Sequence, residues 1–151
     1  MLEGIKTNKL DVIATDHAPH LLSEKEGFCL SAASGGPLIQ HSLLAMLEMS
    51  RCGKLSKEMV IEKMCHSPAQ LFNINKRGFI REGYYADLVL IDPNASYFVE
   101  KENLLYKCEW SPFEGTEFHA KIDKTFVNGN LVYDKGKIQE GSLGKLLEFN
   151  A

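Results

Sequence analysis

The stretch Leu10-Asp11-Val12-Ile13-Ala14-Thr15-Asp16-His17-Ala18-Pro19-His20 decides the fold, because an apolar run leads directly into a polar turn that contains proline. The apolar residues of this run do not alternate cleanly with polar ones, which is typical of a strand that is covered on both faces in a parallel sheet. We therefore predict a short buried strand over residues 10–16, with Asp16 at its C-terminal end.

A loop and then helices are expected after this turn. Residues 21–36 show no helical period and collect serine and glycine near their end, which indicates a loop. The proline that follows suits the first position of a helix. We expect helices at about 37–51 and 57–65, the second capped by Ser56, and a short third helix over residues 67–72.

The pattern becomes strand-like after residue 73. The strand-like runs are residues 79–80, 86–91, 97–99, 122–127 and 130–133. Asn128-Gly129 lies between two of them and is a strong hairpin signal. The predicted fold is therefore α/β, with strand, loop and helices in residues 1–76 and a small β portion with a C-terminal tail in residues 77–151.

Composition excludes several classes of partner. The 151 residues carry a formal net charge of -3, which gives no reason to expect nucleic acid or an anionic membrane. No apolar stretch approaches the length of a membrane span, and the polar, mixed-charge start does not resemble a signal peptide. The four cysteines form no C-x-x-C pair, so we expect structural thiols and a cytoplasmic location.

The turn over residues 16–20 is the candidate for chemistry. In a (β/α)8 barrel, active sites are built at the C-terminal ends of the strands. A carboxylate such as Asp16 can bind a cation there or move a proton, and Pro19 helps to fix the direction of His20. His17 and His20 are so close in a proline turn that separate roles fit better than joint binding of one metal. Composition alone leaves open a polar loop with solvated histidines.

The motif and several later segments resemble the dihydroorotases of the amidohydrolase superfamily. Residues 12–20, followed by Glu24-Lys25, resemble the last-strand signature of those enzymes. The later segments that resemble the family are Gly78-Phe79-Ile80-Arg81-Glu82-Gly83, Ala86-Asp87-Leu88-Val89-Leu90-Ile91-Asp92, Trp110-Ser111-Pro112-Phe113-Glu114-Gly115 and Thr125-Phe126-Val127-Asn128-Gly129-Asn130. These segments occur in family order and cover nearly the whole chain.

The resemblance implies a fold, a reaction and a set of site residues. The fold would be the C-terminal piece of a (β/α)8 barrel followed by part of a small β-sandwich. The reaction would be the metal-dependent interconversion of dihydroorotate and N-carbamoyl-aspartate in pyrimidine biosynthesis, at a binuclear zinc centre. Asp16 matches a metal ligand that also moves the proton, and His20 matches a residue that binds the substrate carboxylate. Ser34 and Gly35 match the segment that contacts the substrate ring, although the loop around them departs from the commoner family pattern.

The chain departs from the family most clearly by what it lacks. The family's His-x-His pair, its bridging lysine or aspartate and two further metal histidines match no residues here. His41, His66 and His119 are interpreted as structural or solvated. We therefore expect a fragment that is inactive and of low stability alone. Its expected partners are a small-molecule substrate and either a homo-oligomer or the missing N-terminal part.

Two alternatives remain open at this point. A hydantoinase or allantoinase relative would act on another cyclic amide, but an anion-binding His20 suits dihydroorotate better. A non-catalytic dihydroorotase-like subunit would support a partner enzyme, although the intact Asp16 and His20 argue against it. The upstream sequence would decide between them, because a non-catalytic relative should lack the His-x-His pair.

Overall fold

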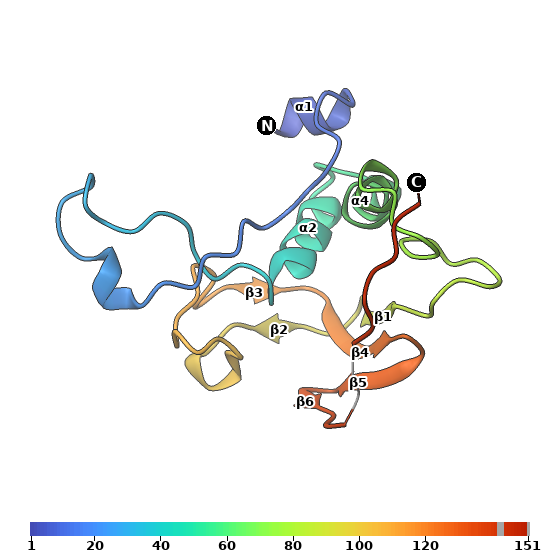
Figure 1. Ribbon diagram of the computed structural model, residues 1–151. Coiled ribbons are helices and arrows are strands. Elements are labelled where there is room, and N and C mark those ends of the chain that lie inside the picture. Colours follow the sequence, from blue (N-terminus) through green and yellow to red (C-terminus); the bar gives the residue numbers. More distant parts are fainter. Residues whose placement is uncertain (142–143, 151) are drawn as a thin grey trace.

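The computed structural model describes residues 1–141 and 144–150, and it places helices first and strands second, as predicted (Figure 1). The helical elements are α1 (Leu2–Lys6), the 3-10 turn η1 (Leu22–Lys25), α2 (Ser42–Arg51), α3 (Lys57–Ile61), the π-helical segment η2 (Glu62–His66), α4 (Ser67–Leu71) and the 3-10 turn η3 (Lys101–Asn103). The strands are β1 (Leu88–Asp92), β2 (Tyr97–Phe98), β3 (Glu117–Phe118), β4 (Lys121–Val127), β5 (Asn130–Asp134) and β6 (Lys137–Ile138).

The strand predicted over residues 10–16 does not form, so that prediction is wrong. A strand needs a neighbouring strand for its backbone groups. Here the recorded N–H bonds of this segment go to helices, from Leu10 to Gly4 O at 3.0 Å and from Ile13 to Lys63 O at 3.0 Å. Strand-type pairing appears only beyond it, as an isolated parallel bridge between His17 and Gly36.

The predicted helices form with changed boundaries. The first begins at Ser42 rather than at residue 37, because the N–H groups of residues 38–40 are bound by side chains of His17 and Tyr106 and hold a turn before the helix. The cap at Ser56 is confirmed, since its hydroxyl accepts the Met59 N–H at 3.1 Å. The second and third predicted helices run on without a break, through η2 into α4.

The described residues of the β portion form two antiparallel sheets. The larger has the order β1-β4-β5-β6, and the smaller pairs β2 with β3. The predicted hairpin is confirmed: Asn128 has φ 52° and Gly129 has φ 82°, as a two-residue turn with both central residues left-handed requires. The strand predicted at residues 79–80 is wrong, because the Phe79 ring stacks on His66 with centroids 4.3 Å apart instead of entering a sheet.

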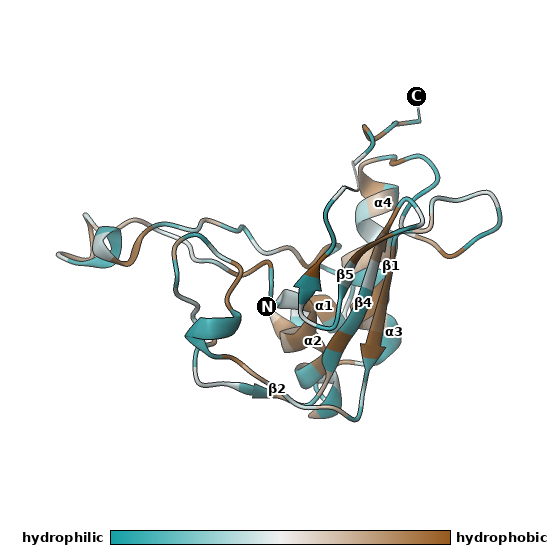
Figure 2. Cartoon of the chain, turned by 90° about the horizontal axis from the view of Figure 1, so that it is seen from below, coloured by the Kyte–Doolittle hydropathy of each residue, from teal (hydrophilic) through white to brown (hydrophobic). Residues whose placement is uncertain are grey.

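The core lies where α2 meets the strands. Leu44 of α2 is buried with Val99, Phe118 and Ala120 of the β portion, and Val99 is 0% exposed. Figure 2 shows β1, β4 and β5 close to α2 and α3, with β1 mainly apolar, while the loop over residues 21–36 extends away from them. Elements from both halves of the chain therefore build this core.

Two further sequence expectations concern the surface. Within residues 1–141 and 144–150, no helix is both long enough and apolar enough to cross a membrane. All four cysteines are free, but only Cys108 is buried. The interpretation as structural thiols is therefore wrong for Cys29, Cys52 and Cys65, because they lie on exposed turns or helix surfaces rather than in the core.

Candidate functional site

The candidate site is the turn over residues 16–20, which leaves the extended segment after α1. Asp16 is exposed and has a left-handed backbone with φ 46°. Aspartate tolerates this conformation better than most residues, but the conformation still costs about 1 kcal/mol. The surrounding contacts must therefore hold Asp16 in place.

The structure brings the second predicted site segment against this turn. Ala18 N–H donates to Gly36 O at 3.1 Å, which pairs the turn with the end of the long loop. Gly35 has φ 86°, and a Cβ added there would lie 2.7 Å from the Ala18 Cβ. Only glycine fits such a close approach in this conformation. The exposed Ser34 precedes it, so Asp16 and the Ser34-Gly35 segment flank one short bridge.

His20 presents its ring at the other end of the turn. The side chain is 40% exposed, and its Nδ1 lies 3.6 Å from Glu24 Oε2. The same Glu24 oxygen accepts the Leu21 N–H at 2.7 Å, which holds the carboxylate in place. A half-exposed imidazole next to a fixed carboxylate can donate a charge-assisted hydrogen bond to an incoming anion when it is protonated.

His17 serves the turn itself, in agreement with the separate roles predicted for the two histidines. Its Nδ1 accepts the Leu38 N–H at 3.1 Å and the Ile39 N–H at 3.4 Å. An Nδ1 that accepts leaves the proton of the neutral ring on Nε2. The ring also lies against Tyr106, with centroids 5.4 Å apart. His17 therefore ties the turn to the segment that enters α2.

Two residues with site contacts were missed from the sequence. Trp110, noted there only within a segment that resembles the family, donates its indole N–H to His20 O at 2.8 Å. Lys25, which had no assigned role, donates to Ala33 O at 2.6 Å and to Gly35 O. The only sequence signal for Lys25 was its place in the Glu24-Lys25 pair after the motif. No sequence signal pointed to the Trp110 contact, because Trp110 and His20 are 90 positions apart.

The chain alone does not fit a binuclear metal centre. Among the residues that the structure describes, no three histidine, cysteine, aspartate or glutamate side chains lie close enough to hold a metal ion. A catalytic zinc ion typically needs about three protein ligands, and Asp16 is one donor. The other histidines have structural contacts, as predicted: His41 with Ser111, His66 with Phe79 and His119 with Glu48.

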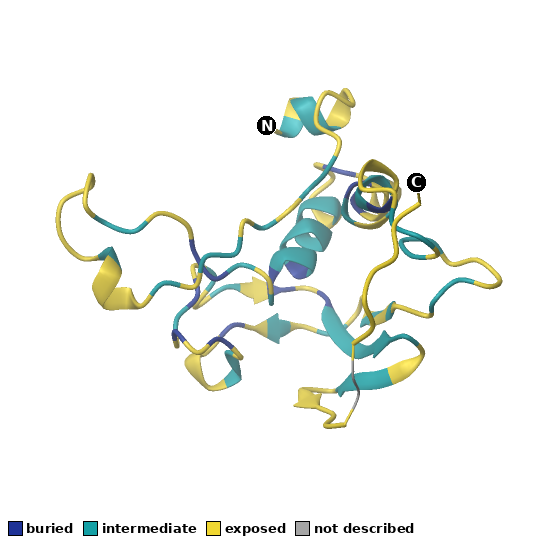
Figure 3. Cartoon of the chain, in the orientation of Figure 1, coloured by how far each residue is buried: buried dark blue, intermediate teal, exposed yellow. Residues whose placement is uncertain are grey.

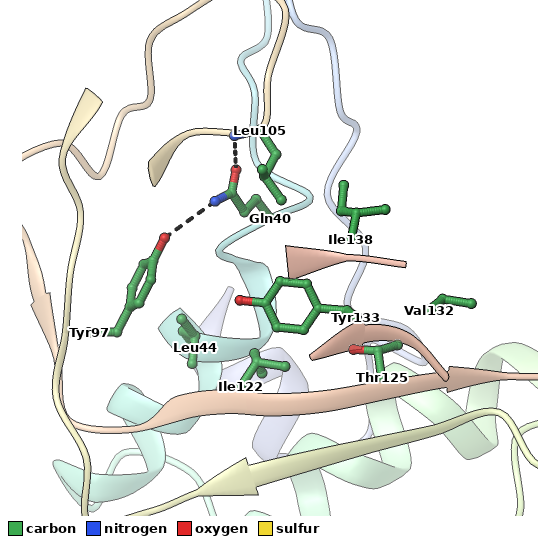
Figure 4. Close-up of a pocket in the computed structure, with 9 residues that line it drawn as sticks. All are labelled: Gln40, Leu44, Tyr97, Leu105, Ile122, Thr125, Val132, Tyr133 and Ile138. Atoms are coloured by element: carbon green, nitrogen blue, oxygen red, sulfur yellow. Dashed lines mark hydrogen bonds between the residues drawn. The ribbon is translucent and has the colours of Figure 1, made fainter. Parts of the chain in front are cut away.

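Two cavities lie near the turn or the core. One of about 510 Å³ is lined by residues that include His17, Pro19, Tyr106 and Lys107. The other, of about 390 Å³, lies between α2 and the larger sheet and is mainly apolar. Figure 4 shows the Gln40 amide in the latter, bonded to the Tyr97 hydroxyl at 3.3 Å and to the Leu105 N–H at 2.8 Å. These bonds satisfy the polar groups of Gln40, so it has a structural role.

Comparison with known proteins identifies the family. The family model described as "Amidohydrolase family" matches residues 1–132. The chain belongs to the amidohydrolase family. Several curated relatives carry the name dihydroorotase. Those from Clostridium acetobutylicum and Halobacterium salinarum are 37% identical, each covering 89% of this chain and 32% of the relative. The one from Clostridioides difficile is 38% identical and covers 89% of this chain and 31% of the relative.

Solved amidohydrolase-type structures have the same fold over this length. L-hydantoinase (dihydropyrimidinase) from Arthrobacter aurescens is 29% identical, with a TM-score of 0.84 over 91% of this chain and 32% of that one. D-hydantoinase from a Thermus species is 25% identical, with a TM-score of 0.84 over 98% of this chain and 34% of that one. This amidohydrolase chain spans about a third of the length of the curated relatives it matches.

Proposed function

We propose that this chain supplies part of the active site of a dihydroorotase, which interconverts dihydroorotate and N-carbamoyl-aspartate in pyrimidine biosynthesis in the cytoplasm. The observation that carries the proposal is the turn over residues 16–20 in contact with the Ser34-Gly35 segment, with Asp16 and His20 exposed enough to meet a ligand. The curated relatives named dihydroorotase support it.

The proposal extends to the architecture of the whole enzyme. Residues 1–76 would form the last part of a (β/α)8 barrel, and residues 77–151 part of a β-sandwich. The remaining two thirds of the fold would pack against them, from the same polypeptide or from another chain. The extended segment over residues 10–16 would then gain the strand neighbours that its backbone lacks among the described residues.

Each site residue has a separate proposed role. Asp16 would act as a proton carrier and as one ligand of a zinc centre whose other ligands lie outside this chain. His20 would bind the substrate carboxylate, and Ser34 and Gly35 would contact the ring through the exposed backbone of the loop. Since the described residues do not form the metal site alone, the isolated chain would be inactive.

Restoring the missing two thirds tests the proposal. In a chimera, this chain would replace the matching third of the Clostridium acetobutylicum dihydroorotase, and we expect it to hydrolyse dihydroorotate. Asp16→Asn should lower kcat at least about a hundredfold, because the amide cannot accept a proton. His20→Ala should lower kcat/KM for dihydroorotate by roughly tenfold to a hundredfold, the loss of one charge-assisted hydrogen bond.

The alternatives predict different outcomes of the same assay. A hydantoinase, suggested by the structural similarity to L-hydantoinase, would prefer an uncharged cyclic amide, and His20→Ala would change its rate little. A non-catalytic subunit would give a folded chimera without turnover. Near-parental turnover of Asp16→Asn would show that Asp16 is not the proton carrier, and enzyme-like turnover by the isolated chain would contradict the proposal as a whole.

A further inference from the structure

The turn over residues 16–20 lacks regular secondary structure that would hold it. Asp16 keeps a left-handed backbone at φ 46°, and such conformations persist where the surrounding structure imposes them. Neither helix nor strand includes residues 10–21. Contacts with distant parts of the chain must therefore fix the direction of Asp16 and His20.

The indole ring of Trp110 makes the most distant of these contacts. Its Nε1 donates to His20 O at 2.8 Å, across 90 residues of sequence. The far edge of the ring lies 3.6 Å from the position a Cβ would take on Gly36. Gly36 is the residue whose carbonyl accepts the Ala18 N–H. The indole thus binds the turn at His20 and lies next to Gly36, the loop partner in the bridge that holds the turn.

Lys25, which lies in the same loop as Ser34 and Gly35, contacts the Trp110 indole. Its ammonium lies 5.9 Å from the centroid of the Trp110 ring, within the range of a cation–π contact. The same ammonium donates to the carbonyls of Ala33 and Gly35. The loop that carries Ser34-Gly35 is therefore folded back against the turn beside the indole.

Trp110 is itself anchored in the core. The next residue, Ser111, is 6% exposed, and its Oγ lies 3.2 Å from Nδ1 of His41, which is 0% exposed. The Ser111 Oγ also accepts the Phe113 N–H at 3.2 Å. Because the Ser111 and His41 side chains are buried, the backbone beside Trp110 cannot move without breaking buried hydrogen bonds.

We propose that Trp110 is a positioning residue for the candidate active site, holding the Asp16–His20 turn to the core through its indole N–H. The assignment of this turn to an active site rests on the proposed function, whereas the positioning contact does not. Trp110 touches no reacting atom in this scheme. It acts through the His20 carbonyl and Gly36.

The first test is backbone amide exchange on the 151-residue chain, with Trp110→Phe. This variant keeps an aromatic ring and removes the donor. We expect Ala18 and Leu38 N–H groups to exchange about twofold to tenfold faster, the equivalent of one lost hydrogen bond. The Val60 N–H, bonded to Ser56 O in α3, should keep its rate.

Phe98→Leu is the matched control, because Phe98 is a half-exposed aromatic residue of β2 that is not bonded to the turn. It should leave the Ala18 rate unchanged. Equal acceleration at Ala18 and Val60 in Trp110→Phe would mean that the residue only stabilises the fold. An unchanged Ala18 rate would mean that the N–H does not hold the turn. Either result overturns the proposal.

A reciprocal test works even if Trp110→Phe does not fold. Trp110 is the only tryptophan, so the chain has a single indole N–H signal in a nitrogen-15 NMR spectrum. Gly35→Ala should push Ala18 away, since the new Cβ would lie 2.7 Å from the Ala18 Cβ. The indole signal should then shift and exchange faster. An unmoved signal, with Ala18 exchange accelerated, would overturn the proposal.

These measurements need no substrate, so their failure is distinguishable from a failure of the proposed function. A protected turn in an inactive chimera would contradict the function and leave the role of Trp110 standing. If Trp110→Phe left the amide exchange of Ala18 unchanged while the chimera was active, the role of Trp110 would be contradicted and the proposed function would stand.

Discussion

Residues 10–36 and the hairpin of β4 and β5 differ in where their contacts originate. In the hairpin, Val127 pairs with Asn130 and Lys124 with Asp134, so each partner is close in sequence. The turn over residues 16–20 instead depends on the Leu38 N–H, 21 residues from His17, and on the Trp110 indole, 90 residues from His20. Local pairing builds the hairpin, whereas distant contacts position the candidate site.

The two regions also differ in burial (Figure 3). Every residue of β4 is half-buried, while Phe28 and Leu30 of the long loop are 87% and 101% exposed. Loops held by few contacts are the segments that binding residues commonly occupy, because a rigid scaffold can present them without burying them. The difference predicts that substitutions at buried tertiary contacts lower the free energy of unfolding more than substitutions at exposed turns and loop tips. Four experiments test this prediction.

The largest expected effect is at Gly78, which lies closely against the helical segment over residues 65–69. Gly78 has φ 79°, and an added Cβ would lie 2.7 Å from Cys65 O and overlap the Ala69 Cβ. Gly78→Ala should lower the free energy of unfolding by about 3 kcal/mol, from the left-handed backbone and overpacking together. Gly83 has the same φ with nothing within 4 Å, so Gly83→Ala should cost about 1 kcal/mol. Urea unfolding measures both losses of free energy. Equal losses for Gly78→Ala and Gly83→Ala would show that close packing at Gly78 adds nothing.

Next in size is the pH dependence that arises from His41. Burial lowers its pKa, so the folded chain keeps the ring neutral, while the unfolded chain binds a proton below its ordinary pKa of 6.5. The contribution of His41 to the free energy of unfolding is therefore fully present above about pH 6.5, and it is lost as the pH falls below this value. One group can account for at most about 2 kcal/mol between pH 6.5 and 5.

Thermal unfolding between pH 7 and 5 measures this loss. The titratable groups facing the His41 ring include Tyr97 and Tyr106, and burial raises both pKa values, so both stay neutral over this range. His41→Phe should remove most of the pH dependence. A pH dependence that persists in His41→Phe would assign it to other groups.

A smaller effect is expected in the hairpin. Gly129 has φ 82° and nothing within 4 Å of an added Cβ, so Gly129→Ala should lower the free energy of unfolding by about 1 kcal/mol through backbone strain alone. Amide exchange at Ala18 should change only as much as global stability does. A selective change at the turn would show that the hairpin and the candidate site are coupled.

The smallest effect is expected at the tip of the long loop. Leu30 is 101% exposed, so Leu30→Ser should change the free energy of unfolding by less than about 0.5 kcal/mol. Val99→Ala is the comparison, because Val99 is 0% exposed and its truncation should cost about 2 kcal/mol. A cost above 1 kcal/mol for Leu30→Ser would reveal contacts that bury the loop in solution.

The sequence by itself determined the features encoded within a few residues. Asn128-Gly129 fixed the hairpin, because both positions must adopt positive φ. Ser56 fixed the start of α3 through one side-chain hydrogen bond. The motif over residues 12–20 and the later segments together indicated the family, which the match over residues 1–132 confirms. The roles of Asp16, His20 and Ser34-Gly35 stay predictions.

Only the tertiary structure decided the features that depend on partners far along the chain. Residues 10–16 have the composition of a buried strand, but no neighbouring strand among the described residues pairs with them, so apolar character alone did not make a strand. Trp110 shows no sign of a site role in the sequence, and only the fold brings its indole N–H to the His20 carbonyl. Hydrophobic pattern and turn chemistry are local properties, whereas the partner of a hydrogen bond across 90 residues is set by how the whole chain packs.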